Sequence, residues 1–154
     1  RSTPCGTLFP YTTLFRSQFL VTRLAWDPDL SVEAVTDDYV RQNFGLRGEA
    51  REAVRNVLME MEGLDASRAA GWIEQLEAAA PAVRTPPHQP WSFAHTIEKA
   101  RLMALDHKIG DGAGWTSPQD VEPVLPVIEE RLLRTDRFWR EVYGLGVLRH
   151  AFIP

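Results

Sequence analysis

The stretch SVEAVTDDYVRQNFG, residues 31–45, decides the fold class. Its apolar residues recur at three- and four-residue intervals, which places them on one face of a helix. They are Val32, Val35, Tyr39 and Val40. Ser31 can cap the first turn and Gly45 is a typical C-terminal stop. The stretch therefore predicts an amphipathic helix over residues 32–44 with a buried apolar stripe.

The same spacing extends in both directions along the chain. It predicts further helices over residues 18–26 and 48–62, from Asp65 or Ser67 to residue 80, from the cap Ser92 to residue 109, and over 127–143. The last is preceded by the cap signature SPQD at 117–120. Short connections make neighbouring helices antiparallel, so we expect an all-α, up-and-down bundle. Residues 18–154 form one helical module, whose subparts 18–83 and 91–154 are joined by the proline-rich link RTPPHQP.

Composition excludes several classes of protein. The chain has 154 residues, of which 44% are hydrophobic and 25% charged, as in an ordinary globular domain. Its net charge of -4 argues against binding to nucleic acid. We also expect no membrane span, since the chain has no run of about eighteen apolar residues. A single cysteine, Cys5, gives no disulfide framework.

The segment TLFPYTTLFRS, residues 7–17, fits neither a strand nor a helix well. It resembles, without a mismatch, the in-frame translation of a widely used short-read sequencing adapter. We therefore expect residues 1–17 to be a non-native, disordered segment. The native frame would then enter at Gln18, with its true N-terminus missing, which leaves the cellular location open.

The sequence signal for catalytic or metal-binding residues is weak. His95 and Glu98 stand three apart on one predicted helix, but HTIE is not the H-E-x-x-H pattern and no further ligands follow at recognisable spacing. A surface or capping role for the histidine is the better interpretation. The glycine-rich GDGAG at 110–114 follows a helix rather than a strand and is interpreted as a helix terminator. We predict no catalytic, cofactor-binding or metal-binding residue.

Tryptophans are frequent in this chain. Trp72 and Trp139 lie on apolar stripes and are expected in the core. Trp91 and Trp115 stand beside the proline- and glycine-rich breaks. They are candidates for an exposed aromatic contact with a sugar or a partner, with loop anchoring as the alternative.

Residues 19–45, FLVTRLAWDPDLSVEAVTDDYVRQNFG, resemble a segment that follows the catalytic barrel in α-glucuronidase-type glycoside hydrolases and related uncharacterised bacterial proteins. The match consists of RLAWDP, DLS and the closing FG. Its structural residues would be Arg23, Trp26, Asp27, Pro28 and Gly45. The motif makes physical sense, because Trp26 can pack at the joint and Asp27-Pro28 can set the turn into the next helix.

This resemblance implies a C-terminal helical region after a barrel whose active site lies upstream. We therefore expect a truncated accessory module of a bacterial glycoside-hydrolase-like protein, inactive alone and without a cofactor, that packs on the missing barrel domain or self-associates as a homo-oligomer. The alternative is an independent helical protein-interaction domain.

Overall fold

The computed structural model describes residues 10–63, 65–85, 92–110 and 114–143, and these residues form helices and turns without a strand. The α-helices are α1 (Pro10–Trp26), α2 (Val32–Phe44), α3 (Gly48–Glu62), α4 (Ala69–Ala79), α5 (Ser92–Ile109), α6 (Pro118–Val121) and α7 (Leu125–Tyr143). Short 3-10 helices lie at Ala66–Arg68, Ala80–Ala82 and Glu122–Val124. The predicted all-α class is confirmed.

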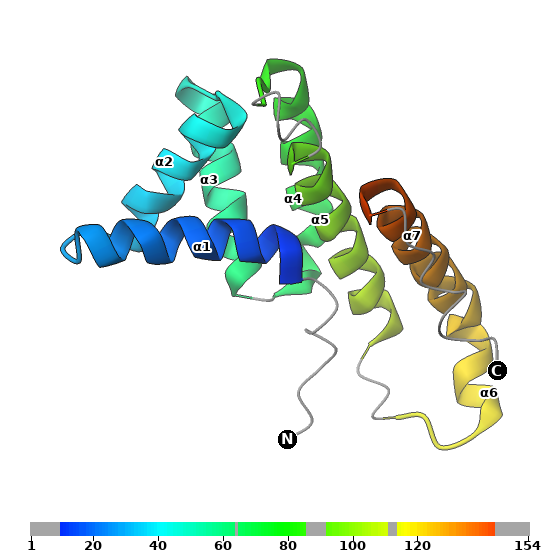
Figure 1. Ribbon diagram of the computed structural model, residues 1–154. Coiled ribbons are helices and arrows are strands. Elements are labelled where there is room, and N and C mark those ends of the chain that lie inside the picture. Colours follow the sequence, from blue (N-terminus) through cyan, green and yellow to red (C-terminus); the bar gives the residue numbers. More distant parts are fainter. Residues whose placement is uncertain (1–9, 64, 86–91, 111–113, 144–154) are drawn as a thin grey trace.

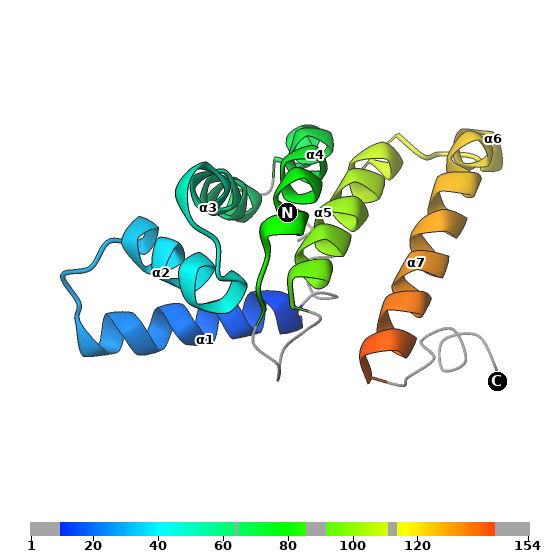
Figure 2. The ribbon, with the colours of Figure 1, turned by 90° about the horizontal axis from the view of Figure 1, so that it is seen from above.

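Helices that follow one another in the sequence pack against one another in space. The pairs are α1 with α2, α2 with α3, α3 with α4, α4 with α5, and α5 with α7. Figure 2 shows α2, α3, α4, α5 and α7 as an open row, and Figure 1 shows α1 lying across α2 and α3. This order is the expected up-and-down arrangement, and it follows from connections too short to skip a neighbour.

The ends of α2 are set by local chemistry. The Ser31 hydroxyl accepts a hydrogen bond of 3.1 Å from the amide of Ala34, which caps the first turn. Gly45 ends the helix with a φ of 64°, a left-handed conformation that favours glycine. The carbonyl of Phe44, the last residue of α2, accepts a hydrogen bond of 2.7 Å from the amide of Arg84. The end of α2 is therefore tied to the segment that follows α4.

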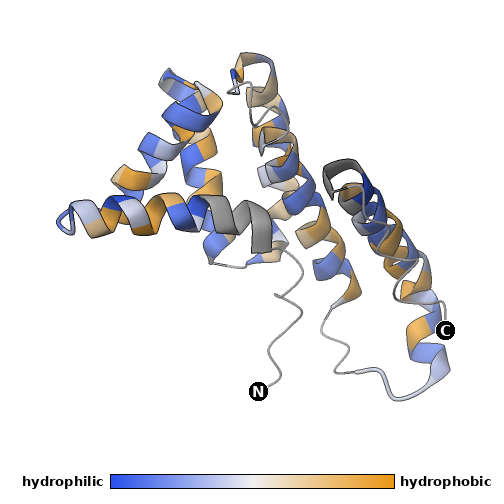
Figure 3. Cartoon of the chain, in the orientation of Figure 1, coloured by the Kyte–Doolittle hydropathy of each residue, from blue (hydrophilic) through white to orange (hydrophobic). Residues whose placement is uncertain are grey.

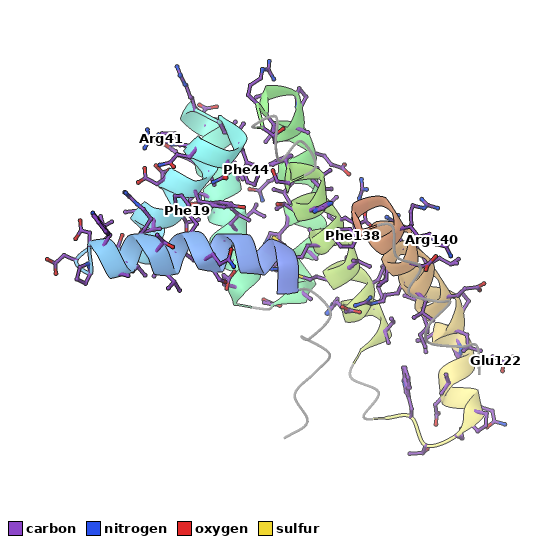
Figure 4. All side chains as sticks on the ribbon, in the orientation of Figure 1. Phe19, Arg41, Phe44, Glu122, Phe138 and Arg140 are labelled. Carbon is purple, nitrogen blue, oxygen red and sulfur yellow. The ribbon has the colours of Figure 1, made fainter. Side chains whose placement is uncertain are left out.

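The core lies between α2, α3, α4 and α5. Its aromatic side chains meet edge to face, with ring centres 5.5 Å apart from Phe19 to Tyr39, 5.5 Å from Tyr39 to Phe44, and 4.9 Å from Phe44 to Phe93. Figure 4 labels Phe19 on α1 and Phe44 on α2. Trp72 is 1% exposed, as predicted, and its indole nitrogen donates a 2.7 Å hydrogen bond to Glu60. These contacts join helices from both sides of the proline-rich link.

The expected N-terminal limit of the first helix needs correction. We predicted helix from residue 18, whereas α1 begins at Pro10. Proline is compatible with the first turn of a helix, because its fixed φ is helical and its missing amide proton has no partner there in any case. Residues 1–9 lie outside the described part of the chain.

Two positions that were predicted to be packed are wrong. Val32 is 46% exposed because it starts α2, before the helix reaches the core, and Trp26 is 89% exposed at the far end of α1. Periodicity located the helices correctly but misjudged these positions at their ends.

Candidate functional site

The exposed side of α1 is unusual. Over residues 16–26, where side chains are described, the exposed residues recur at the i, i+3, i+4, i+7, i+8 spacing of one helical face. They are Gln18, Val21, Thr22, Ala25 and Trp26, and we call them the α1 outer face. Val21 is 67% exposed and Trp26 is 89% exposed. Within these described side chains the outer face carries no charge, and Figure 3 shows apolar positions along α1.

The charged residues of the same stretch point inward instead. Arg16 is only 4% exposed. Arg23 forms a 2.8 Å ion pair with Asp38 on α2, and Arg41 holds the other oxygen of Asp38 at 2.7 Å. The hydrogen bond from Arg41 lowers the pKa of the Asp38 carboxyl, and the charges of Arg41 and Arg23 act in the same direction. In this part of α1 the inner side therefore combines these arginines with the packed Phe19, and the outer side carries uncharged residues.

The other residues of the motif form the turn that follows α1. The carboxylate of Asp27 accepts a hydrogen bond of 3.3 Å from the amide of Asp29. The backbone carbonyl of Asp27 accepts a second one of 3.3 Å from the amide of Leu30. Pro28 lies inside this turn, as expected. The predicted packing of Trp26 at the joint is wrong for the described chain, because the end of α1 projects past its neighbours.

A buried polar pocket lies where α1, α2, α3 and α5 meet, and we call it the Arg16 pocket. Its cavity of about 20 Å³ is lined by Arg16, Tyr39, Leu58, Met61, Glu62, Thr96 and Lys99. One terminal nitrogen of Arg16 donates to the carbonyl of Leu58 at 3.0 Å and to Glu62 at 2.6 Å. The other donates to the hydroxyl of Thr36 at 3.1 Å. A cavity of this size has room for about one water molecule.

Burial dominates the electrostatics of the Arg16 pocket. Desolvation lowers the pKa of Arg16, and the carboxylate of Glu62 opposes that effect. Desolvation also lowers the pKa of Lys99, again opposed by Glu62, while the charge of Arg16 lowers it further. The pKa of the Tyr39 hydroxyl is raised by burial. Two cations thus share one half-exposed carboxylate, which offsets part of the cost of burying their charge, and the cavity is too small to receive a large substrate.

His95 is buried, which corrects the predicted surface or capping role. It is 6% exposed on α5, and its ring centre lies 4.7 Å from that of Phe138, which Figure 4 shows on the side of α7 facing α5. Desolvation lowers the pKa of His95 to about 4. Glu98 points instead into ion pairs with Arg101 and Arg134, at 3.3 and 3.2 Å. Within the described residues no group of three or more histidine, cysteine or acidic side chains is arranged to hold a metal ion.

The structure describes one of the two tryptophans proposed for aromatic contact. Trp115 is 37% exposed, just before the capping box in which Ser117 and Asp120 start α6. Trp91 lies outside the described residues, as do His88, His150 and Cys5. A joint platform of Trp91 and Trp115 therefore stays a prediction.

Two polar contacts were not predicted from the sequence. The Arg16 pocket was missed because residues 7–17 were set aside, and a lone arginine carries no signal of burial. The second is the contact of α5 with α7, where Arg131, 7% exposed, grips both oxygens of Asp106 at 2.7 and 3.1 Å. Thr135, one turn further along α7, accepts a hydrogen bond from Arg131. The i, i+4 spacing of Arg131 and Thr135 is the one signal for this contact in the sequence.

No protein-family model, curated protein or solved structure matches this chain. Over the described residues, no helix combines the length and the apolar character needed to cross a bilayer.

Proposed function

We propose that this chain is a C-terminal helical accessory module of a bacterial glycoside-hydrolase-like protein, and that the α1 outer face packs against the domain preceding it. The observation that carries the proposal is the uncharged, exposed face of α1, with Trp26 89% and Val21 67% exposed. The role is structural, and the chemistry belongs to the preceding domain.

The physical argument starts from the cost of leaving this face in water. Burying a side chain such as Val21 contributes about 1.5–3 kcal/mol, and tryptophan offers a still larger apolar area. An exposed apolar patch commonly marks a contact with another protein surface, and Val21, Ala25 and Trp26 supply the apolar part of this face. Arg16 is buried and Arg23 is paired with Asp38, so neither arginine belongs to the outer face that would be covered.

The resemblance to the α-glucuronidase type supplies the identity of the proposed partner. RLAWDP contains both Arg23, which pins α1 to α2, and Trp26, which is left exposed. In the families that this segment resembles, the helical region follows a barrel. A glycosidase barrel of this kind would provide the pair of carboxylic acids that cleaves a sugar bond.

The test begins with the DNA contiguous with the codon for Gln18. Its upstream reading frame should encode a barrel with two acidic catalytic residues. That barrel, produced separately, should bind the chain, and Trp26→Ala should weaken the binding at least tenfold, as expected for a central aromatic contact. Trp115→Ala, in another part of the fold, is the matched control and should leave the affinity unchanged. A start codon beside Gln18, or equal affinities for both variants, would overturn the proposal.

One observation favours the alternative of an independent helical interaction domain. α7 exposes Leu125 by 52% and Leu133 by 53%, next to the partly exposed Leu132. A second surface of this kind suits a partner helix or another copy of the chain. Light scattering separates the two surfaces: a dimer of the full chain that Leu133→Glu converts to a monomer, while Trp26→Ala does not, places the association on α7 and favours this alternative over packing through the α1 outer face.

A further inference from the structure

The two terminal nitrogens of Arg16 meet acceptors, whereas its buried Nε has no hydrogen-bond partner within the described part of the chain. Its two terminal nitrogens reach acceptors on two different helices: the carbonyl of Leu58 and the carboxylate of Glu62 on α3, and the hydroxyl of Thr36 on α2. The sulfur of Met59 lies 3.7 Å from the second nitrogen and adds a weak acceptor. The donors are thus divided between the two arms of the planar fork.

An ammonium group would not satisfy this arrangement equally well. Its donors radiate from one nitrogen, whereas the acceptors here are met by two nitrogens at once. Lys99 already brings an ammonium to the same pocket, and desolvation lowers its pKa. The hydroxyl of Thr36 is fully buried, and a buried hydroxyl needs a hydrogen-bond partner. The pocket therefore selects for shape as well as for positive charge.

All these acceptors lie after Gln18. Thr36, Leu58, Met59 and Glu62 belong to α2 and α3, outside the segment that resembles a translated adapter. Their geometry is consequently a property of the helical module, whatever the origin of residues 7–17.

We propose that the Arg16 pocket is a socket for a guanidinium group. Arg16 fills it in this chain. The socket locks the first helix onto α2 and α3, and it accepts a small guanidinium compound from solution when the arginine side chain is removed.

Chemical rescue tests this proposal in the full chain. Arg16→Ala removes the atoms that correspond to ethylguanidinium, so the probe is ethylguanidinium chloride at low millimolar concentration, followed by thermal unfolding. We expect a saturable rise in the melting temperature of R16A, little or no rise in the unsubstituted chain, and a smaller rise with propylammonium. Equal shifts in R16A and the unsubstituted chain, or equal shifts with both probes, would overturn the socket.

Two further variants keep the test decisive. Arg16→Met fills the space of the arginine side chain with an uncharged side chain and should abolish the rescue. Because Lys99 could swing towards Glu62 in R16A, the double variant R16A/K99Q is measured as well, and absence of binding in both backgrounds would refute the proposal.

A separate measurement covers the case in which R16A does not fold. Thr36→Val, nearly isosteric, should destabilise the chain more when Arg16 is present than in the Arg16→Met background. An equal effect in the two backgrounds would show that Thr36 and Arg16 are not coupled and would contradict the socket. None of these measurements involves the α1 outer face, so the socket and the proposed function stand or fail separately.

Discussion

Substituting Gly45 by alanine should destabilise the fold much more than the same change at Gly48. Both glycines have a positive φ, 64° and 55°, where an L-residue costs about 1–2 kcal/mol. They differ in their surroundings. A Cβ at Gly45 would lie 2.9 Å from the Cβ of Arg84 and 3.0 Å from its carbonyl oxygen, whereas a Cβ at Gly48 would meet nothing within 4 Å.

The crowding at Gly45 cannot be relieved cheaply. The backbone of Arg84 is fixed by its 2.7 Å hydrogen bond to the carbonyl of Phe44, so relief requires the two segments to separate. Overpacking of this kind costs about 1–3 kcal/mol. The sum of the two contributions is about 2–5 kcal/mol for Gly45→Ala, against about 1–2 kcal/mol for Gly48→Ala.

Urea unfolding followed by circular dichroism at the helical minimum measures both free energies. In a domain of this size each kcal/mol corresponds to about 2–4 °C in melting temperature, so thermal unfolding provides a second readout. Gly48→Ala is the matched control for the conformational contribution alone. Losses of stability that agree within about 0.5 kcal/mol would refute the close approach of α2 to the segment after α4.

Three further predictions concern the buried polar groups and the α1 outer face. Burial lowers the pKa of His95 from its ordinary 6.5 to about 4 in the folded state, so below pH 6.5 the folded chain binds fewer protons than the unfolded chain. The stability that the neutral His95 contributes is therefore present above pH 6.5 and is lost as the pH falls towards 4. Urea unfolding at pH 7 and pH 4.5 should differ by up to about 3 kcal/mol, and His95→Gln should reduce this difference; an unchanged pH dependence would contradict the assignment. Arg131→Ala should cost about 1–3 kcal/mol and raise amide exchange in α7 more than in α3; uniform exchange across both helices would speak against a local role. Trp26→Ser should change stability by less than about 0.5 kcal/mol, because the indole is 89% exposed, whereas Trp72→Ala should cost about 3–5 kcal/mol; a large loss for Trp26→Ser would show that this side chain is packed.

The positions of the helices could be read from the sequence with few errors. The predicted helices over 32–44, 48–62 and 92–109 coincide with α2, α3 and α5. Ser31, Gly45 and the capping box at Ser117 act within one turn of the chain, so local composition is sufficient to identify them. The first helix was cut short because residues 10–17 look unfavourable for a helix when taken alone.

The candidate sites could not be read in the same way. Arg16, His95 and Arg131 belong to residue types that are usually exposed, yet each is less than 10% exposed here. Their partners come from other helices: Leu58 and Glu62 for Arg16, Phe138 for His95, and Asp106 for Arg131. The spacing of residues within one helix does not predict a contact with another helix.

The amino-acid sequence by itself determined that the chain is helical, where α2, α3 and α5 lie, and which residues cap or end α2. These features depend on backbone conformation, capping and periodicity, all of which act between residues close in the chain. Only the tertiary structure decided that Trp26 is exposed, that Arg16 occupies a pocket, and that α1 turns an uncharged face outward. Burial depends on which distant segments come to lie across a side chain, and that is settled by packing of the whole chain.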